Sequence, residues 1–167
     1  MRLYTLTPIV LTIVAVSAPL RADEAARVLI EVINEAEKTV SLTAADLAKL
    51  PQKEVTAKDH KGEEARYAGV LLADVLKRAD VALGANLRGK LLANQLLVEA
   101  ADQYRVAFSL PEIDPEWTDN VVLLATTRNG APLDEAHGPL QIVIPSEKRH
   151  SRWVKQVVRM TVRADAR

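Results

Sequence analysis

A histidine before a glycine and a proline is the sharpest chemical feature of this sequence. His137 stands directly before Gly138 and Pro139, and an apolar run follows. A glycine lets the backbone approach a ligand closely and a proline fixes the entry to a strand, so we expect the imidazole at the rim of a sheet. The same pattern is typical of a histidine that caps a surface turn.

A dense basic group follows the next apolar run. It consists of Lys148, Arg149, His150, Arg152 and Lys155. Donors this close together can converge on an anion, because guanidinium groups bind phosphate oxygens in pairs. Such a run is also typical of a solvated surface. Arg152 shares the parity of Val154 and Val158, so we expect it to point toward the packed face and to need a carboxylate or a bound anion as partner.

Asp59 and His60 form another candidate, an acid–base pair in a turn that contains Gly62. A plain surface turn explains the same residues. The three histidines, His60, His137 and His150, could meet around a metal ion, although none has the i, i+4 spacing of a zinc-binding helix. The sequence contains no cysteine, so it offers no thiolate nucleophile and no thiolate ligand for zinc, iron–sulfur clusters or molybdenum.

Short apolar runs bounded by turn residues predict the strands that position these side chains. We expect strands at residues 27–34, 38–42 and 53–58, a hairpin over 96–110 bent at 101–103, and strands at 121–125, 140–144 and 154–162. The last three runs would form a sheet with the polar groups at one edge. In the final run, Val154, Val158 and Met160 are expected to be buried, while Lys155 and Arg159 face water.

Two short helices are expected between the strands. Residues 43–46 (TAAD) match a helix start, and Pro51 ends that helix. An apolar stripe with helical spacing predicts a second helix after Gly69. The stripe consists of Leu72, Val75, Leu76 and Ala79. Strands with interspersed helices, without regular βαβ alternation, predict an α+β domain with a mixed sheet.

Five motifs occur in an order that resembles the molybdopterin-binding domain of the sulfite oxidase family. They are residues 67–76 (YAGVLLADVL), 101–104 (ADQY), 122–125 with 129–133 (VLLA, NGAPL), 137–140 with 143–145 (HGPL, VIP) and 152–154 (RWV). The resemblance covers about residues 28–162. It implies that family's mixed α+β fold and a molybdopterin whose phosphate is held by basic groups.

The resemblance also places individual residues. His137 matches a family histidine near the cofactor, and Arg152 stands where the family has a basic residue before tryptophan. Together with the anion argument, this gives His137, Gln141, Arg149 and Arg152 as the candidate cofactor-binding residues.

The sequence departs from the family pattern at two functional positions. Family members ligate molybdenum through a cysteine after the strand that corresponds to residues 53–58, and residues 57–60 contain none. Gln141 stands where the family usually has an arginine. Loss of a thiolate and of a phosphate-binding fork predicts a domain that binds an anionic ligand or the pterin without the family's redox turnover. We therefore assign no metal ligand and no catalytic residue.

The N-terminal residues predict export. Arg2, an apolar stretch over residues 3–18 and small residues up to Ala22 indicate a secretory signal peptide over residues 1–22. The stretch is shorter than the roughly 20 residues of a membrane span, and an uncleaved anchor is the alternative. Residues 23–167 then form a single domain with 20 basic and 22 acidic residues, which argues against nucleic-acid binding. We expect a periplasmic location.

Two other functions stay open. An active oxidoreductase could ligate molybdenum through an oxygen atom, and Asp59 is the candidate ligand, with His137 and Arg152 steering an oxyanion. An envelope protein-interaction module would instead use the acidic loop of residues 111–119, which carries Trp117.

Overall fold

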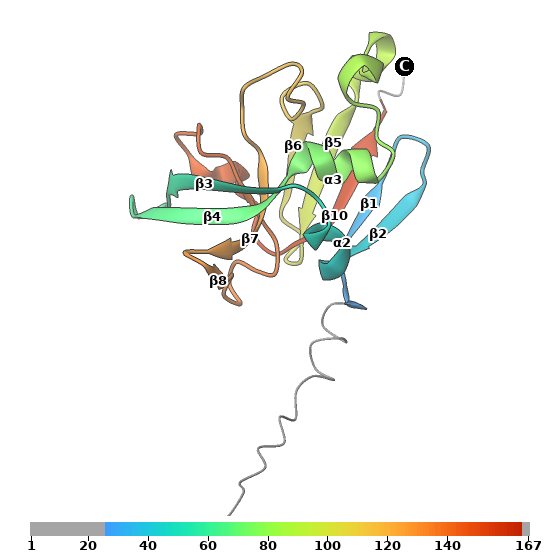
Figure 1. Ribbon diagram of the computed structural model, residues 1–167. Helices are drawn as coiled ribbons and strands as arrows, with labels where there is room; N and C mark the ends of the chain where they lie inside the picture. Colours follow the sequence, from blue (N-terminus) through green and yellow to red (C-terminus); the bar gives the residue numbers. More distant parts are fainter. Residues whose placement is uncertain (1–25, 165–167) are drawn as a thin grey trace, which may run out of the picture.

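The computed structural model describes residues 26–164 as two five-stranded sheets with short helices (Figure 1). The predicted signal peptide, residues 1–22, lies outside the described residues. The strands are β1 (Val28–Ile33), β2 (Thr39–Thr43), β3 (Gln52–Lys58), β4 (Glu64–Leu71), β5 (Gln95–Ala100), β6 (Arg105–Ser109), β7 (Leu123–Arg128), β8 (Ala131–Pro132), β9 (Gln141–Val143) and β10 (Val157–Arg163). The helices are α2 (Ala44–Ala48) and α3 (Leu72–Arg78), with 3₁₀ turns η1 (Gly84–Asn86), η2 (Gly89–Ala93) and η3 (His150–Arg152).

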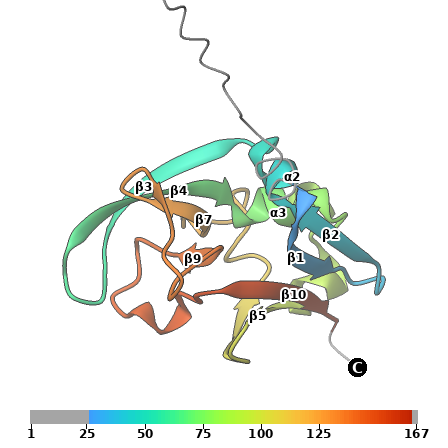
Figure 2. The ribbon, with the colours of Figure 1, turned by 90° about the horizontal axis from the view of Figure 1, so that it is seen from below.

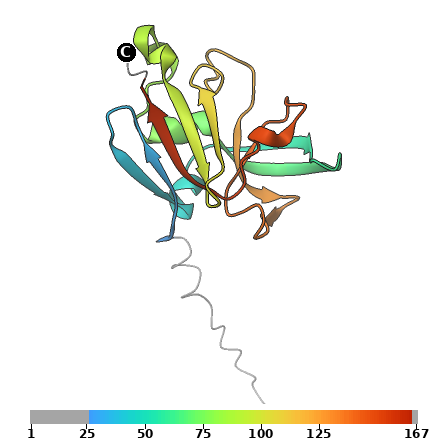
Figure 3. The ribbon, with the colours of Figure 1, turned by 180° about the vertical axis from the view of Figure 1, so that it is seen from behind.

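The first sheet has the order β2-β1-β10-β5-β6. Its hairpins β1–β2 and β5–β6 are the two that the sequence predicts. β10 lies between them, parallel to β1 and antiparallel to β5, as Figure 3 shows from behind. One parallel pair among antiparallel ones makes this sheet mixed, so the predicted α+β class is confirmed.

The second sheet has the order β3-β4-β7-β8, and β9 also pairs with β7 (Figure 2). β4 is a strand that the sequence analysis did not predict, because small and charged residues weaken its alternating apolar pattern. Gly69 is essential to its pairing with β7. A Cβ atom at this position would lie 2.1 Å from the Leu124 carbonyl oxygen, so only glycine allows the backbones to approach.

Both helices form where the sequence predicts them, with corrected boundaries. Thr43 caps α2, and its side chain and that of Asp46 complete a capping box. α3 begins at Leu72 and not directly after Gly69, because β4 continues through Leu71. The predicted stripe of α3 is buried and belongs to one hydrophobic cluster with residues of both sheets. No helix of residues 26–164 is long and apolar enough to cross a membrane.

The last strand begins later than predicted. Gln156 has a positive φ of 49°, and the pairing of β10 with β5 shifts register between Val157 and Arg159. The first irregularity reverses the parity and the second restores it, so Val154 is buried as predicted, Val157 is also buried, and Val158 is 39% exposed, which contradicts the prediction for Val158. The expected burial of Met160 and exposure of Arg159 are confirmed.

The three C-terminal apolar runs do not share one sheet, as the sequence analysis expected. β7 and β9 belong to the second sheet and β10 to the first. Backbone hydrogen bonds join the two sheets here, from Ile142 to the carbonyl of Val154 (2.8 Å) and from Gln156 to the carbonyl of His137 (2.9 Å). The polar groups therefore converge at a junction between sheets and not along one sheet edge.

Candidate functional site

The junction between the sheets holds a cavity of about 200 Å³, which we call the histidine pocket. It is lined by Asp59, His60, Tyr67, Arg128, His137, Gln141, His150, Trp153 and Lys155. All three histidines of the chain meet here, although they lie on three separate segments. Within residues 26–164, however, no three histidine or carboxylate side chains are placed to hold one metal ion.

His137 is held by a carboxylate on its own turn. Its Nδ1 lies 2.6 Å from Oδ1 of Asp134, and this hydrogen bond holds the pKa of the Asp134 carboxyl below its usual value. The backbone N–H groups of His137 and Gly138 both donate to the Asp134 carbonyl. A Cβ at Gly138 would lie 3.0 Å from that of Leu133, so the glycine serves a close approach within the loop, and the expected approach to a ligand stays a prediction. Nε2 of His137 has no hydrogen-bond partner among the described residues.

Gln141 is, with Asp59, one of the two buried polar residues of the pocket. It begins β9 and is only 3% exposed. No hydrogen bond joins its carboxamide to another group in residues 26–164, although the side chain lines the cavity. Its amide atoms are not among the side-chain atoms of residues 26–164 that are both buried and without a partner, so they face the cavity, where a bound polar group can replace water.

Asp59 and Arg128 also line the pocket and form an ion pair. Oδ1 of Asp59 accepts hydrogen bonds from the backbone N–H groups of Lys61 (2.8 Å) and Glu63 (3.0 Å), and Oδ2 lies 2.7 Å from Nη2 of Arg128. Burial alone would raise the pKa of the Asp59 carboxyl. The backbone donors and the guanidinium outweigh this effect, so its pKa lies below the usual value. Asp59 therefore pairs with Arg128 and not with His60.

Aromatic rings close the third side of the pocket. The ring of His150 contacts Trp153 edge-on, with centroids 4.3 Å apart, and its Nε2 donates to the Lys58 carbonyl at 2.8 Å. The ring of Trp153 in turn packs edge-on against that of Tyr67, with centroids 5.7 Å apart, and its Nε1 donates to the Ile144 carbonyl. These contacts fix η3 against β3 and β4, and so position the imidazole of His150.

Arg152 lies outside the histidine pocket. Its guanidinium pairs with Glu112 at 3.0 Å and with Glu147, and it lies 4.8 Å from the centre of the Phe108 ring. Burial alone would lower the pKa of Arg152, but hydrogen bonds to both carboxylates outweigh it and raise the pKa. The prediction that Arg152 needs a carboxylate or an anion is thus met by carboxylates of the chain itself.

The structure brings together only part of the predicted site. His137 and Gln141 line the pocket, whereas Arg152 is engaged elsewhere and Arg149 is an exposed residue that precedes η3. Their predicted roles with a cofactor stay predictions. Sequence reasoning missed Arg128 and Tyr67. The Asn129-Gly130 turn after Arg128 was a usable signal, since it places Arg128 at the end of a hairpin strand.

The sequence and the fold of this chain are similar to those of known proteins. A family model described as the oxidoreductase molybdopterin binding domain matches residues 16–167. Among solved structures, the sulfane dehydrogenase SoxCD from Paracoccus pantotrophus is similar, with a TM-score of 0.62 and 23% sequence identity. The alignment covers 80% of this chain but only 37% of that one, so the likeness shows a shared fold over little more than a third of the larger protein. No match was found among curated proteins.

Proposed function

Because this chain belongs to the family of oxidoreductase molybdopterin-binding domains, we propose that its histidine pocket binds an anionic ligand, either a small oxyanion or the phosphate of a pterin, without the family's redox turnover. The match to the family supports a pterin-type ligand. The absence of cysteine from the whole sequence supports the lack of redox turnover. The cationic side chains that line the pocket support the binding of an anion.

The carboxamide of Gln141, which faces the cavity and has no hydrogen-bond partner among residues 26–164, is the observation that carries this proposal. It lies in a cavity whose other side chains are mainly potential cations, including Lys155, Arg128 and the three histidines. Arg128 is balanced by Asp59, but no acidic partner for Lys155 is found among residues 26–164. An anion would accept hydrogen bonds from the amide and from protonated side chains, and such charge-assisted bonds are strong.

The residues of the histidine pocket fit the phosphate end of the family cofactor but not its molybdenum end. The cationic lining suits a phosphate group, and His137 and Gln141 would hold it. The cavity of about 200 Å³ is smaller than the roughly 300–1,000 Å³ that enclose drug-sized ligands, so the rest of a pterin would extend beyond it. The sequence contains no cysteine, so it offers no thiolate ligand for molybdenum, and we derive no redox step from this site.

Geometry does not favour Asp59 as a replacement metal ligand. Both of its oxygens already accept hydrogen bonds, and a metal would have to displace the Arg128 guanidinium from Oδ2. An active oxidoreductase built on Asp59 would therefore lose an ion pair each time it bound its metal.

Inorganic phosphate is the simplest probe of the pocket. Calorimetric titration of the purified protein should show one binding site. Gln141→Leu should weaken phosphate binding about tenfold or more, because it removes a hydrogen bond to a charged group. Arg149→Ala is the matched control, since it removes an exposed cation near His150 and should leave the affinity unchanged.

Two results would overturn the proposal. If Arg149→Ala and Gln141→Leu weaken binding equally, the anion binds to surface charge and not in the pocket. If protein made in a pterin-producing host contains stoichiometric molybdenum and turns over a substrate, the domain is a redox enzyme. Pterin analysis of the same preparation decides whether the bound anion is a free oxyanion or a pterin phosphate.

We also propose that the protein is exported to the periplasm. The support is the sequence of residues 1–22 alone, with its positive start and apolar stretch.

A further inference from the structure

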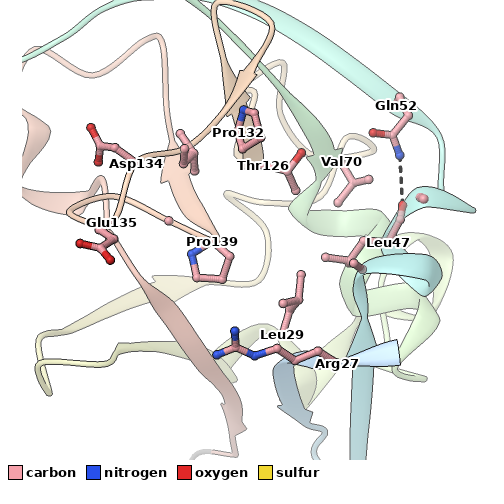
Figure 4. A pocket seen from close by; sticks show the side chains of 14 residues that line it. Arg27, Leu29, Leu47, Gln52, Val70, Thr126, Pro132, Asp134, Glu135 and Pro139 are labelled. Atoms are coloured by element: carbon pink, nitrogen blue, oxygen red, sulfur yellow. Dashed lines mark hydrogen bonds between the residues drawn. The ribbon is translucent and has the colours of Figure 1, made fainter. Parts of the chain in front are cut away.

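A second cavity lies on the other side of the loop that carries His137 and shares no lining residue with the histidine pocket. Its volume is about 530 Å³, within the range of small-molecule sites. Its walls come from β1, α2, the end of β4, β7 and the loop between β8 and β9 (Figure 4). We call it the aliphatic cavity.

The floor of the aliphatic cavity is apolar but contains no aromatic ring. It is formed by Leu29, Leu47, Val70, Pro132, Leu133 and Pro139. Such a surface gains free energy by covering branched aliphatic groups, at about 25 cal/mol per Å² of buried apolar area. It offers no stacking partner for a flat ring system such as a pterin.

Charges of both signs stand at the rim. Figure 4 shows the carboxylates of Asp134 and Glu135 together at one edge, and the guanidinium of Arg27 apart from them, beside Leu29. Within residues 26–164, neither Arg27 nor Glu135 has a side-chain hydrogen bond or salt bridge. One edge can therefore bind an ammonium group, while another can bind a carboxylate.

Neutral polar groups lie between these edges. Nε2 of Gln52 donates to the carbonyls of Leu47 and Leu50, which leaves its oxygen as an acceptor without a donor among the described residues. The hydroxyl of Thr126 contacts the Ala68 carbonyl only at 3.4 Å. Both groups can bond to the amides of a ligand.

From these features we propose that the aliphatic cavity binds a short aliphatic peptide with free termini. Its branched side chains cover the apolar floor, its ammonium group lies at Asp134 and Glu135, and its carboxylate lies at Arg27. Gln52 and Thr126 hydrogen-bond to its backbone. The two cavities share no lining residue, although Asp134 of this one is hydrogen-bonded to His137 of the other.

Trileucine is the probe for this proposal. Calorimetry should show one site per protein. Capping either terminus, with an acetyl group or as an amide, should weaken binding about two- to fivefold, the range that one exposed charge pair gives. With Glu135→Lys, the acetyl-capped peptide should bind more tightly than the amide-capped one, because a cationic edge repels the ammonium group that only the amide-capped peptide retains.

A blocking variant tests the location. Ala48 is exposed and lines the cavity, so Ala48→Trp fills its mouth without removing a buried group. This variant should lose trileucine binding while retaining phosphate binding. Ala45→Trp places the same side chain on α2 at a residue that does not line the cavity, and it should bind trileucine normally.

Three outcomes would overturn the proposal: no trileucine binding, equal binding to Ala48→Trp, or equal affinity for the uncapped peptide and one with both termini capped. The last result would identify a site for neutral aliphatic molecules. None of them bears on the histidine pocket, whose own test is phosphate binding by Gln141→Leu.

Discussion

At the scale of single residues, charge pairing separates the cations that hold the fold from those that face a ligand. Arg152 is surrounded by Glu112 and Glu147 and connects the loop after β6 to the segment before η3. Lys155 and Gln141 line a cavity without such partners. From the sequence alone, Arg149 and Arg152 have the same predicted role in binding an anion, but Arg149 is exposed whereas Arg152 is paired with two carboxylates.

Arg152→Met tests this distinction. We expect a loss of about 1 kcal/mol in the free energy of unfolding, because two carboxylates lose a partly exposed partner, and no change in phosphate affinity. Urea unfolding and calorimetry measure the two quantities. Arg149→Met, at an exposed position, should change neither. Weaker phosphate binding by Arg152→Met, with stability intact, would return Arg152 to the anion site.

At the scale of elements, α2 shows how a five-residue helix is stabilised despite its length. So short a helix is marginal by itself, and the capping box supplies partners for its first N–H groups. Oδ2 of Asp46 accepts hydrogen bonds from the hydroxyl (2.7 Å) and the backbone N–H (3.1 Å) of Thr43. Because α2 also forms a wall of the aliphatic cavity, its cap affects the shape of that site.

The same cap predicts a dependence of stability on pH. The hydrogen bonds from Thr43 lower the pKa of Asp46 from 3.8 to about 2. A carboxyl whose pKa is depressed by folding stabilises the protein fully above its unfolded value and loses this contribution as pH falls toward the folded one. Asp46→Ala should therefore lower stability clearly more at pH 7 than near pH 2, where the folded-state carboxyl is already about half protonated.

Urea unfolding at both pH values measures this difference. Asp119→Ala is the control, since Asp119 is exposed and has no described hydrogen bond. If Asp46→Ala lowers the free energy of unfolding equally at pH 7 and near pH 2, the ionised carboxyl contributes nothing to the cap.

At the scale of the whole molecule, one hydrophobic cluster joins both sheets and both helices. The chain thus builds a core without disulfides, which suits the absence of cysteine. Outside this core, Trp117 is 51% exposed in the acidic loop between β6 and β7. Contact of this loop with an envelope partner stays a prediction.

Export is tested on the whole protein. Expressed in a Gram-negative host, the chain should be recovered from the periplasmic fraction with a mass that corresponds to residues 23–167. Replacing apolar residues of the 3–18 stretch with charged ones should retain the full-length protein in the cytoplasm. Full-length protein in the membrane fraction would instead indicate an uncleaved anchor.

Local patterns in the sequence were sufficient for most of the fold. Alternation predicted the β1–β2 and β5–β6 hairpins, and the TAAD motif predicted the cap of α2, because both depend on neighbours a few residues apart. β4 and the register of β10 could not be predicted. The former depends on a backbone contact between Gly69 and Leu124, and the latter on the positive φ of Gln156.

The sequence by itself determined which chemistry is available: no thiolate, three histidines and a basic segment, in an order typical of one family. Only the tertiary structure decided which of these groups meet. His60, His137 and His150 converge because backbone hydrogen bonds join the two sheets beside them, and Arg152 is turned away because Glu112, forty residues earlier, pairs with it. Contacts between residues far apart in the chain leave no periodic trace in a sequence.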